Sequence, residues 1–202
     1  MEFSVETTNM NKLNREDLLS LEKYSEQRAE FRARVLEHKK DRRVSIGPNL
    51  ALYFEDRLTI QYQVQEMLRI EKIFEAAGIE DELNAYNPLI PDGSNLKCTA
   101  MLEFGDVDVR RERLAQLVGI EHLVWLRVEG NDKVFAISNE DLERSTDEKT
   151  SAVHFMRFEL TAEMIAALRG GAGLSFGTNH AGYPYTVQVS AESRAALLED
   201  LE

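Results

Sequence analysis

The sequence has a single cysteine, Cys98, among its 202 residues. One cysteine cannot form an intramolecular disulfide, and it cannot supply the ligands of an iron–sulfur cluster or a multi-cysteine zinc site. This scarcity is typical of proteins in a reducing compartment, so we expect a cytoplasmic protein. Hydrophobic runs are short as well. No segment approaches the roughly 18 apolar residues that a membrane-spanning helix requires, so we expect no membrane association.

Positive charge is also in short supply. The chain has 24 lysines and arginines against 36 aspartates and glutamates, a formal net charge of −12 at pH 7. A surface of that sign repels nucleic acids and anionic membranes, so we expect neither as a partner. Residues 28–43 are the exception, with seven basic side chains against three acidic ones. We interpret this segment either as a solvated helix face that the acidic body attracts or as an anion site.

The hydrophobic pattern predicts an α+β protein. Residues 1–11 lack the apolar core of a secretory signal and predict a flexible tail. Residues 12–202 predict a single α+β domain, because a hydrophobic content of 43% in a chain of this length suits one core. Within it, residues 12–90 are expected to form a helical layer and residues 94–202 a largely antiparallel sheet with flanking helices.

Two long amphipathic helices are predicted in the helical layer. The first follows the capping residue Asn14, and the second runs from about residue 58 to Gly78. One charge interrupts each apolar stripe: Arg28 in the first helix and Glu71 in the second. A charge in a core is costly unless it is paired. We therefore predict that Arg28 contacts Glu71 or Glu66; the alternative is that both charges reach solvent.

Period-two alternation predicts the strands. Strands are expected at residues 44–54, 96–104 and 151–160 and in two hairpins, 121–129 with 133–138 and 173–177 with 183–189; shorter helices are expected at residues 80–86, 109–118, 162–169 and 191–201. Residues 87–95 are a loop, because two prolines and the pair Asp92-Gly93 break regular structure. Since the loop also contains Leu89 and Ile90, we expect it to pack on the second helix and close a pocket.

Four blocks of the sequence resemble an uncharacterised bacterial family that is defined only as a domain of unknown function. The blocks are Gly47-Pro48-x-Leu50-x-Leu52-x-Phe54-Glu55-x-Arg57-x-Thr59, Gln63-x-Gln65-Glu66-Met67-x-Arg69-x-Glu71, residues 87–97, and Lys149-Thr150-Ser151-Ala152-Val153-His154-Phe155 with Arg157-Phe158. They span nearly the whole chain. A further segment, near the C-terminus, departs from the family pattern: where the family has His-Pro-x-Tyr, this sequence has His180-Ala181-Gly182-Tyr183.

The resemblance implies a setting for the protein and no reaction. The resemblance implies that genes of the family often lie beside genes for rubrerythrin-like and heterodisulfide-reductase-like iron–sulfur proteins. The implied partner is a redox or iron–sulfur protein, and the implied setting is a bacterial redox or oxidative-stress module. The family provides no catalytic residues that could be assigned to this chain.

Polar side chains on and near the second helix are candidates for a ligand site. A guanidinium donates two parallel hydrogen bonds to a carboxylate or phosphate, so clustered arginines suit a small anion. The candidate ligand-binding residues are Arg28, Glu55, Arg57, Gln63, Glu66, Arg69 and Tyr183.

A mononuclear metal site is a further possibility. His154, His180 and Glu66 offer the nitrogen and oxygen ligands that such a site uses. His154 also suits a hydrogen-bonded core position, because it lies on the apolar face of its strand. We predict that the second helix, the strand with His154 and the turn with His180 and Tyr183 converge on one site. No motif implies any other cofactor, and the paired Glu-x-x-His motif of a diiron centre is missing.

Two functions remain open. The sequence contains neither a nucleophile elbow nor a phosphate-binding loop. This favours a cytoplasmic accessory or binding protein of a bacterial redox module. The alternative is an enzyme or metal-dependent sensor that acts on a small anionic molecule through an Arg/Glu/His site.

Overall fold

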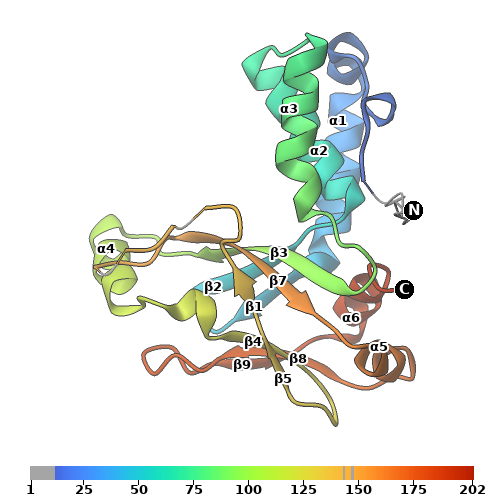
Figure 1. The fold of residues 1–202 in the computed structure, drawn as a ribbon. Helices are drawn as coiled ribbons and strands as arrows, with labels where there is room; N and C mark the ends of the chain where they lie inside the picture. Colours follow the sequence, from blue (N-terminus) through green and yellow to red (C-terminus); the bar gives the residue numbers. More distant parts are fainter. Residues whose placement is uncertain (1–11, 143, 147) are drawn as a thin grey trace, which may run out of the picture.

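The computed structural model describes residues 12–202 except residues 143 and 147, so the predicted tail 1–11 lies outside the described residues. The fold is α+β, as predicted. Three helices form a bundle that stands upright on one end of a body built from two sheets, which gives the molecule the shape of an L (Figure 1).

The helices are α1 (Leu21–His38), α2 (Arg57–Glu71), α3 (Ala76–Tyr86), α4 (Val107–Gln116), α5 (Ala162–Arg169) and α6 (Ala191–Leu198). Single turns of 3-10 helix lie at Arg15–Asp17, Lys39–Arg42, Asn87–Leu89 and Ile120–His122. The strands are β1 (Arg43–Ile46), β2 (Leu50–Phe54), β3 (Asn95–Leu102), β4 (Val124–Val128), β5 (Lys133–Phe135), β6 (Ile137–Ser138), β7 (Val153–Glu159), β8 (Leu174–Thr178) and β9 (Thr186–Gln188). None of the helices in the described ranges is long and apolar enough to cross a membrane.

The strands form two antiparallel sheets. One has the order β1-β2-β3-β7-β6 and the other the order β5-β4-β8-β9. The chain runs through α1, enters the first sheet as β1 and β2, returns to the bundle as α2 and α3, and then completes both sheets (Figure 1). The turn between β1 and β2 requires glycine, because Gly47 has φ +65° and a Cβ there would meet the ring of Tyr185 at 2.5 Å.

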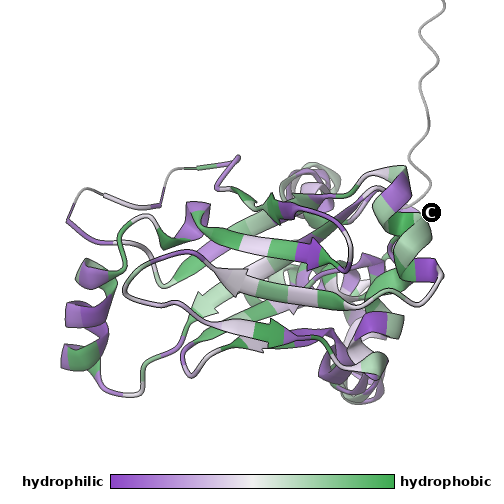
Figure 2. Ribbon diagram, turned by 90° about the horizontal axis from the view of Figure 1, so that it is seen from below, coloured by the Kyte–Doolittle hydropathy of each residue, from purple (hydrophilic) through white to green (hydrophobic). Residues whose placement is uncertain are grey.

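Alternation along the strands produces the main core between the two sheets. Phe54 and Phe158 of the first sheet and Phe176 of the second are almost completely buried. The ring of Phe176 lies 5.2 Å from that of Phe54 and 5.5 Å from that of Phe158, so these side chains interlock across the sheets. Apolar residues are concentrated along the strands, and the outer loops are largely hydrophilic (Figure 2).

A separate small core holds the bundle together. It contains Ile60, Val64 and Leu68 of α2, Leu83 of α3 and Ile90 of the following loop. Because Ile90 is only 5% exposed and packs with α2, the prediction that this loop is anchored on the second helix is confirmed.

Amide side chains fasten the segment before α1 to the bundle. The Oε1 atom of Gln65 accepts a hydrogen bond from the Leu19 amide at 2.6 Å, and its Nε2 donates to the Leu19 carbonyl at 3.2 Å. Asn87 forms the same pair of bonds with Leu13, each 2.8 Å long. A primary amide can satisfy both groups of one residue's backbone where water is excluded. The amide-rich second helix therefore has a structural purpose.

The first helix begins later than predicted. Asn14 does form a capping box with Asp17, but it caps only the 3-10 turn Arg15–Asp17. The helix α1 starts at Leu21, where the Ser20 side chain accepts from the backbone of the first turn. The capping motif at Asn14 therefore caps the 3-10 turn that precedes α1, and not α1 itself.

The second helix ends earlier than predicted, at Glu71 instead of Gly78. Lys72 adopts a left-handed conformation with φ +57° and closes the helix, a role usually taken by glycine. Gly78 lies inside the separate helix α3, and Phe74, which falls within the predicted helix 58–78, is 72% exposed.

The predicted hairpin of residues 121–129 and 133–138 is divided between the two sheets. Strand β5 pairs with β4, whereas β6 pairs with β7 in the other sheet. The change of sheet takes place at Ala136, which is buried. Alternation predicted the extended backbone here, but it contains no information about which neighbour each strand takes.

Candidate functional site

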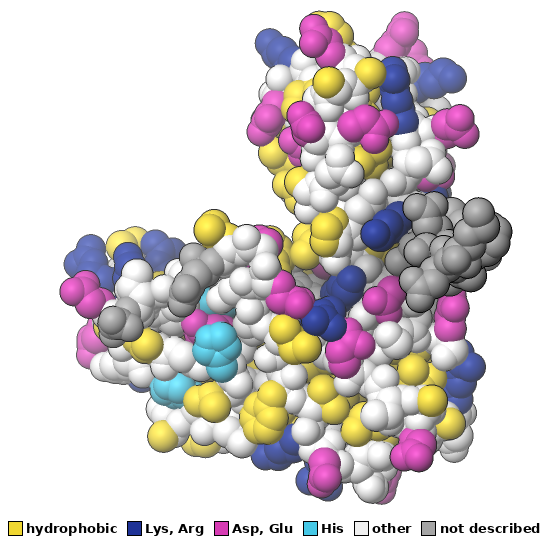
Figure 3. All heavy atoms as spheres, viewed as in Figure 1, with side chains coloured by type: hydrophobic (Ala, Val, Ile, Leu, Met, Phe, Trp, Pro, Cys, Tyr) yellow, Lys and Arg dark blue, Asp and Glu magenta, His cyan; other side chains and the backbone are white. Residues whose placement is uncertain are grey.

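The inner corner of the L contains a large cavity. Its volume is about 720 Å³, and it lies between the loop that follows α3 and the strands β3, β6 and β7. Leu89 and Ile90 line it from the loop, and Ile137 and Phe155 from the strands. Hydrophobic side chains lie beside basic and acidic ones at this corner (Figure 3). Pockets that hold small ligands have volumes of roughly 300–1,000 Å³ and the same mixed lining.

A second cavity, of about 430 Å³, adjoins the first. Tyr86, Leu89 and Phe155 line both cavities, so the two are parts of one hollow, called the groove below. The second part extends to Ile60 and Gln63 of α2. The loop after α3 therefore closes a pocket together with the second helix, which confirms that prediction.

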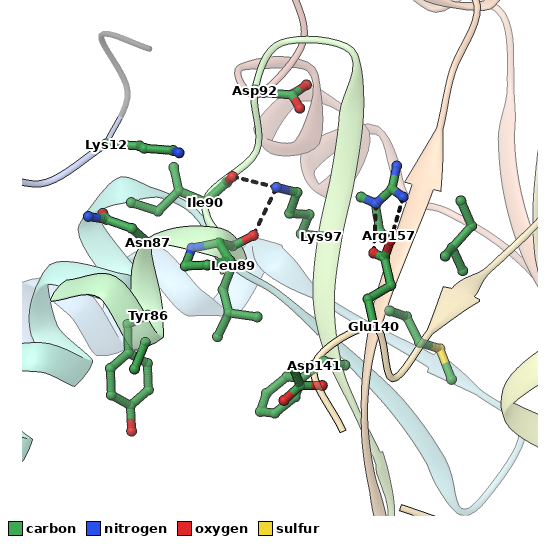
Figure 4. Close-up of a pocket in the computed structure, with 15 residues that line it drawn as sticks. Lys12, Tyr86, Asn87, Leu89, Ile90, Asp92, Lys97, Glu140, Asp141 and Arg157 are labelled. Atoms are coloured by element: carbon green, nitrogen blue, oxygen red, sulfur yellow. Dashed lines mark hydrogen bonds and ion pairs between the residues drawn. The ribbon is translucent and has the colours of Figure 1, made fainter. Parts of the chain in front are cut away.

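Two basic side chains lie next to each other in the first part of the groove. Lys97 on β3 and Arg157 on β7 are direct partners in the register of these strands, and both line the cavity. Like charges in directly opposite positions repel each other and destabilise a sheet. Figure 4 shows Lys97 reaching toward loop carbonyls and Arg157 toward Glu140, so each cation is held by other groups.

Lys97 fixes the loop that covers the groove. Its Nζ atom donates hydrogen bonds to the carbonyl oxygens of Pro88 and Ile90, each at 2.9 Å. Burial lowers the pKa of Lys97, and the neighbouring Arg157 acts in the same direction, against the opposing charge of Asp92. An ammonium group has three N–H donors. Its third donor has no acceptor among the residues that the structure describes.

Arg157 is held by two carboxylates. Its Nε and Nη2 atoms donate to Glu140 at 2.9 and 2.7 Å in a bidentate pair, and its Nη1 donates to Glu159. The hydrogen bond from Arg157 lowers the pKa of Glu140. The Glu140 side chain is 53% exposed, whereas that of Arg157 is 26% exposed. The pair is therefore accessible from the solvent on the Glu140 side.

Three of the predicted ligand residues form a cluster inside the bundle. Glu66 accepts hydrogen bonds from Arg28 at 2.7 and 2.9 Å, from Arg69 at 3.2 Å and from the Tyr24 hydroxyl at 2.7 Å. The bond from Arg28 is the main reason why the pKa of Glu66 falls to about 2, against the effect of burial. The prediction that Arg28 meets a carboxylate of the second helix is confirmed for Glu66, and Glu71 is exposed. Because both Glu66 oxygens are engaged, this cluster links α1 to α2.

The remaining arginine and the polar neighbours of α2 are distributed elsewhere. Arg57 forms an ion pair with Asp17 at 2.6 Å. Glu55 and Gln63 line the second part of the groove, where the Thr99 hydroxyl donates to Glu55 at 2.9 Å. Two of the seven predicted ligand residues thus lie at the groove.

His154 belongs to a buried network on the inner face of β7. Its Nε2 atom lies 2.9 Å from the Thr150 hydroxyl, which donates to Glu121 at 2.9 Å. Its Nδ1 atom faces the side-chain amide of Asn139. The Ser145 hydroxyl also donates to Glu121. The network connects the loop between β6 and β7 to the body, which is the satisfied core position that the strand pattern also allowed.

His180 and Tyr183 have separate partners. The Nδ1 atom of His180 accepts a hydrogen bond from the Gly182 amide at 3.1 Å. The Tyr183 hydroxyl donates to the Ile46 carbonyl at 2.9 Å and accepts from the Leu50 amide at 3.0 Å, which closes the turn between β1 and β2. Among the described residues, no hydrogen bond or ion pair joins His180 or Tyr183 to the network of His154 or to the bundle cluster.

The predicted metal site of His154, His180 and Glu66 is therefore not formed. These residues lie on an inner sheet face, in a turn of the other sheet and in the bundle, and each has its own hydrogen-bond partners. Within residues 12–142, 144–146 and 148–202, no group of three or more His, Cys, Asp or Glu side chains is placed to hold a metal ion. Tyr183 binds the turn between β1 and β2, His154 binds Thr150 and His180 binds Gly182, so each of the three has partners other than the predicted site.

The chain is similar to a known protein family and to a solved structure. A model of the family described as "Protein of unknown function (DUF3501)" matches residues 12–201. The chain belongs to this DUF3501 family. A crystal structure of a novel protein of unknown function from Burkholderia pseudomallei K96243 has 53% sequence identity and a TM-score of 0.90, over 95% of this chain and 100% of that chain. No curated protein matches. The family match confirms that the sequence blocks resemble a family defined only as a domain of unknown function.

Sequence reasoning missed the basic pair that marks the groove of this DUF3501 protein. Alternation places Lys97 and Arg157 on the outer faces of their strands, each beside an apolar neighbour. That signal could have identified two half-polar strand faces. The register that brings the two charges opposite each other exists only in the paired sheet.

A second missed group lies at the junction of the bundle and the body. Arg42, only 1% exposed, donates to the Ala196 carbonyl at 2.9 Å and forms ion pairs with Asp200 and Asp56. His38 also contacts Asp56. In this DUF3501 protein, these contacts join the end of α1 to the start of α2 and to α6. Within the basic segment 28–43, Arg42 therefore has a structural role.

The histidine network predicts a component of acid sensitivity. Burial lowers the pKa of His154 below its ordinary value of 6.5, against the opposing effect of Glu121. The folded state then binds fewer protons at this site than the unfolded state, so the stability contributed by neutral His154 is lost as the pH falls below about 6.5. We expect the wild type to lose more free energy of unfolding than His154→Gln between about pH 7.5 and about pH 5.5.

Urea unfolding of the two proteins at each pH measures this difference. The comparison with the variant cancels the contribution of other titrating groups. Equal losses in the two proteins would show that His154 is not protonated on unfolding.

Proposed function

We propose that this DUF3501 protein is a binding protein with an accessory role in a bacterial redox module, and that it binds its ligand in the groove. The supporting observation is the construction of the groove. Its covering loop is held by Ile90 in the bundle core and by Lys97 from the sheet, so the hollow is preformed. A preformed, mostly apolar hollow with a few fixed charges suits binding with a low ordering cost.

The environment of Cys98 supports an accessory role. The chain's single cysteine is buried on the inner face of β3, and burial raises its thiol pKa well above the ordinary value. A thiol in that state is protonated and inaccessible, so it is unsuited to electron or sulfur transfer. In the proposed module, redox chemistry belongs to a partner, and this protein binds and presents a molecule in the cytoplasm.

The geometry is less favourable to the alternative of an enzyme or sensor with an Arg/Glu/His site. That function needs the bundle arginines and the histidines in one place, but Arg28 and Arg69 neutralise Glu66 while His154 is engaged with Thr150. The basic residues that line the groove are instead Lys12, Lys97 and Arg157 in its first part and Lys39 in its second.

Filling the groove tests the proposal without removing core atoms. Ala85 is exposed on α3 and lines the first cavity, so Ala85→Trp should occupy part of the hollow. Ala77 is exposed on the same helix and serves as the matched control, Ala77→Trp. A panel of neutral and charged aromatic fragments is titrated while backbone amide chemical shifts are recorded by NMR.

We expect saturable shifts centred on the groove, with affinities at least about tenfold lower in Ala85→Trp and unchanged in Ala77→Trp. Fragments that bind elsewhere, or that bind both variants equally, would contradict the proposal. The same two variants can be mixed with a purified rubrerythrin-like or iron–sulfur partner, and a ligand-dependent association is expected only where the groove is open.

A further inference from the structure

The pair formed by Arg157 and Glu140 has the geometry of a bound carboxylate. The guanidinium meets both Glu140 oxygens, at 2.9 and 2.7 Å, at the edge of the cavity (Figure 4). Planar recognition of this type is selective for carboxylate and phosphate groups. Of the three acidic residues that line the cavity, Asp92, Glu140 and Asp141, Glu140 is the one whose carboxylate Arg157 binds.

The internal carboxylate is held less firmly than the arginine. Glu140 immediately follows Asn139, which has a left-handed φ of +57°, and the two-residue strand β6 precedes it. Its side chain is 53% exposed. Ion pairs at that level of exposure contribute little net stability. Arg157, by contrast, lies within β7 and keeps a second partner in Glu159.

The immediate neighbours of Arg157 suit a negative group with an apolar body, and Asp92 and Asp141 line other parts of the cavity. Lys97 stands directly opposite Arg157, so the repulsion between the two cations is relieved by any anion placed near both. Beyond the charges, Leu89, Ile137 and Phe155 offer apolar surface inside a volume of about 720 Å³. A carboxylate alone would leave that surface uncovered.

We infer that the groove of the proposed binding protein, on which this assignment rests, takes a small organic carboxylate whose acid group displaces Glu140 from Arg157 and whose apolar body lies against Phe155 and Leu89. Glu140 is thus a built-in competitor that occupies the acid subsite when no ligand is present. The chemical class is a monocarboxylic acid with an aromatic or aliphatic body.

The test uses phenylacetate as the probe and phenylacetamide as its neutral counterpart. Binding is followed through the Nε–H resonance of Arg157 and through backbone amides of the groove in the wild-type protein, Glu140→Gln, Arg157→Met and Arg157→Lys. Arg127→Met is the matched control, because Arg127 is exposed on β4 in the other sheet. Phenyl phosphate distinguishes a carboxylate site from a phosphate site.

We expect phenylacetate to bind Glu140→Gln about threefold more tightly than wild type, since the exposed internal pair is weak. Arg157→Met should weaken binding at least about tenfold, and Arg157→Lys should also weaken it, because the bidentate fork is lost. Arg127→Met should bind like wild type, and phenylacetamide should bind at least about tenfold more weakly than phenylacetate.

Three results of these affinity comparisons would overturn the inference: equal affinity for acid and amide, no effect of either Arg157 variant, or tighter binding of phenyl phosphate. In the first two cases binding that is still blocked by Ala85→Trp leaves the proposed function standing. If phenylacetate does not bind Glu140→Gln at millimolar concentration, the carboxylate assignment is wrong. The response to neutral fragments then shows whether the groove binds ligands, as the proposed function requires.

Discussion

Replacing Arg42 by leucine is expected to lower the free energy of unfolding by about 3–5 kcal/mol. The guanidinium is 1% exposed, and it is paired with Asp200 and Asp56. It also donates to the carbonyl oxygens of Ala196 and Glu55 at 2.9 and 3.3 Å. A leucine would remove this donor from the buried Asp200 carboxylate and from both carbonyl oxygens, while Asp56 would keep its contacts with His38 and the Thr59 amide. The contacts among α1, α2 and α6 would then weaken together.

The next residue in the chain provides the control. Arg43 has a 44% exposed side chain and pairs with Glu103 at 3.2 Å on the surface of the body. We expect Arg43→Leu to change the free energy of unfolding by less than about 1 kcal/mol. Urea unfolding followed by the fluorescence of the single tryptophan, Trp125, measures both variants. If the two variants lost equal stability, the buried position of Arg42 would have no energetic meaning.

The cost of Arg42→Leu should also depend on pH. Burial raises the pKa of Asp200 to about 6, although Arg42 opposes this effect. A raised carboxyl pKa means that the folded state binds more protons, so Asp200 destabilises the fold increasingly as the pH rises from its ordinary pKa of 3.8 to about 6, and the loss levels off above that pH. Without Arg42 its pKa would rise further. We therefore expect the penalty to be larger at pH 7 than at pH 5, where Asp200 is largely protonated in both proteins.

Replacing Glu121 by leucine is expected to cost about 2–4 kcal/mol of stability. The Glu121 carboxylate is 1% exposed and accepts hydrogen bonds from Ser145 and Thr150. Burial by itself would raise the pKa of Glu121, but these hydroxyl groups and the nearby His154 bring it below the ordinary value. The group is therefore ionised at neutral pH, and its removal leaves buried donors without an acceptor.

Glu148→Leu is the control for this experiment, because Glu148 is exposed in the loop between β6 and β7, which also contains Ser145 and Thr150. A change within about 0.5 kcal/mol is expected for it. Hydrogen exchange provides an independent readout, since Glu121→Leu should increase the exchange of backbone amides in the loop between β6 and β7 before it affects β3. Uniform loss of protection would mean that the network stabilises the whole body and not this loop.

The sequence contained enough information for the class of fold and for several elements. The alternation around Cys98 predicted β3, and the helices expected at residues 162–169 and 191–201 correspond to α5 and α6. The interruption of an apolar stripe by Arg28 predicted its contact with Glu66. These predictions rest on local rules of periodicity, capping and charge burial, which neighbouring parts of the chain do not alter.

Local rules failed where a residue behaved against its type or where a strand had to choose a partner. Lys72 ends α2 in a conformation that glycine usually adopts, so the sequence offered no sign of the stop. Ile137 and Ser138 continue the extended pattern of β5 yet pair with β7. The histidines were expected to meet because their nitrogens could ligate a metal ion, but His154 on β7 binds the Thr150 hydroxyl and His180 binds the Gly182 amide.

By itself, the sequence determined an α+β protein with an acidic surface, an anchored loop at residues 87–95 and one cysteine on an apolar strand face. Only the tertiary structure decided that this loop covers a groove, that Lys97 lies opposite Arg157, and that Glu140 occupies the acid-binding position. The reason is physical. Composition and periodicity specify which face of an element is buried, whereas the register between strands and the packing of the bundle against the sheet are set by contacts between residues far apart in the chain.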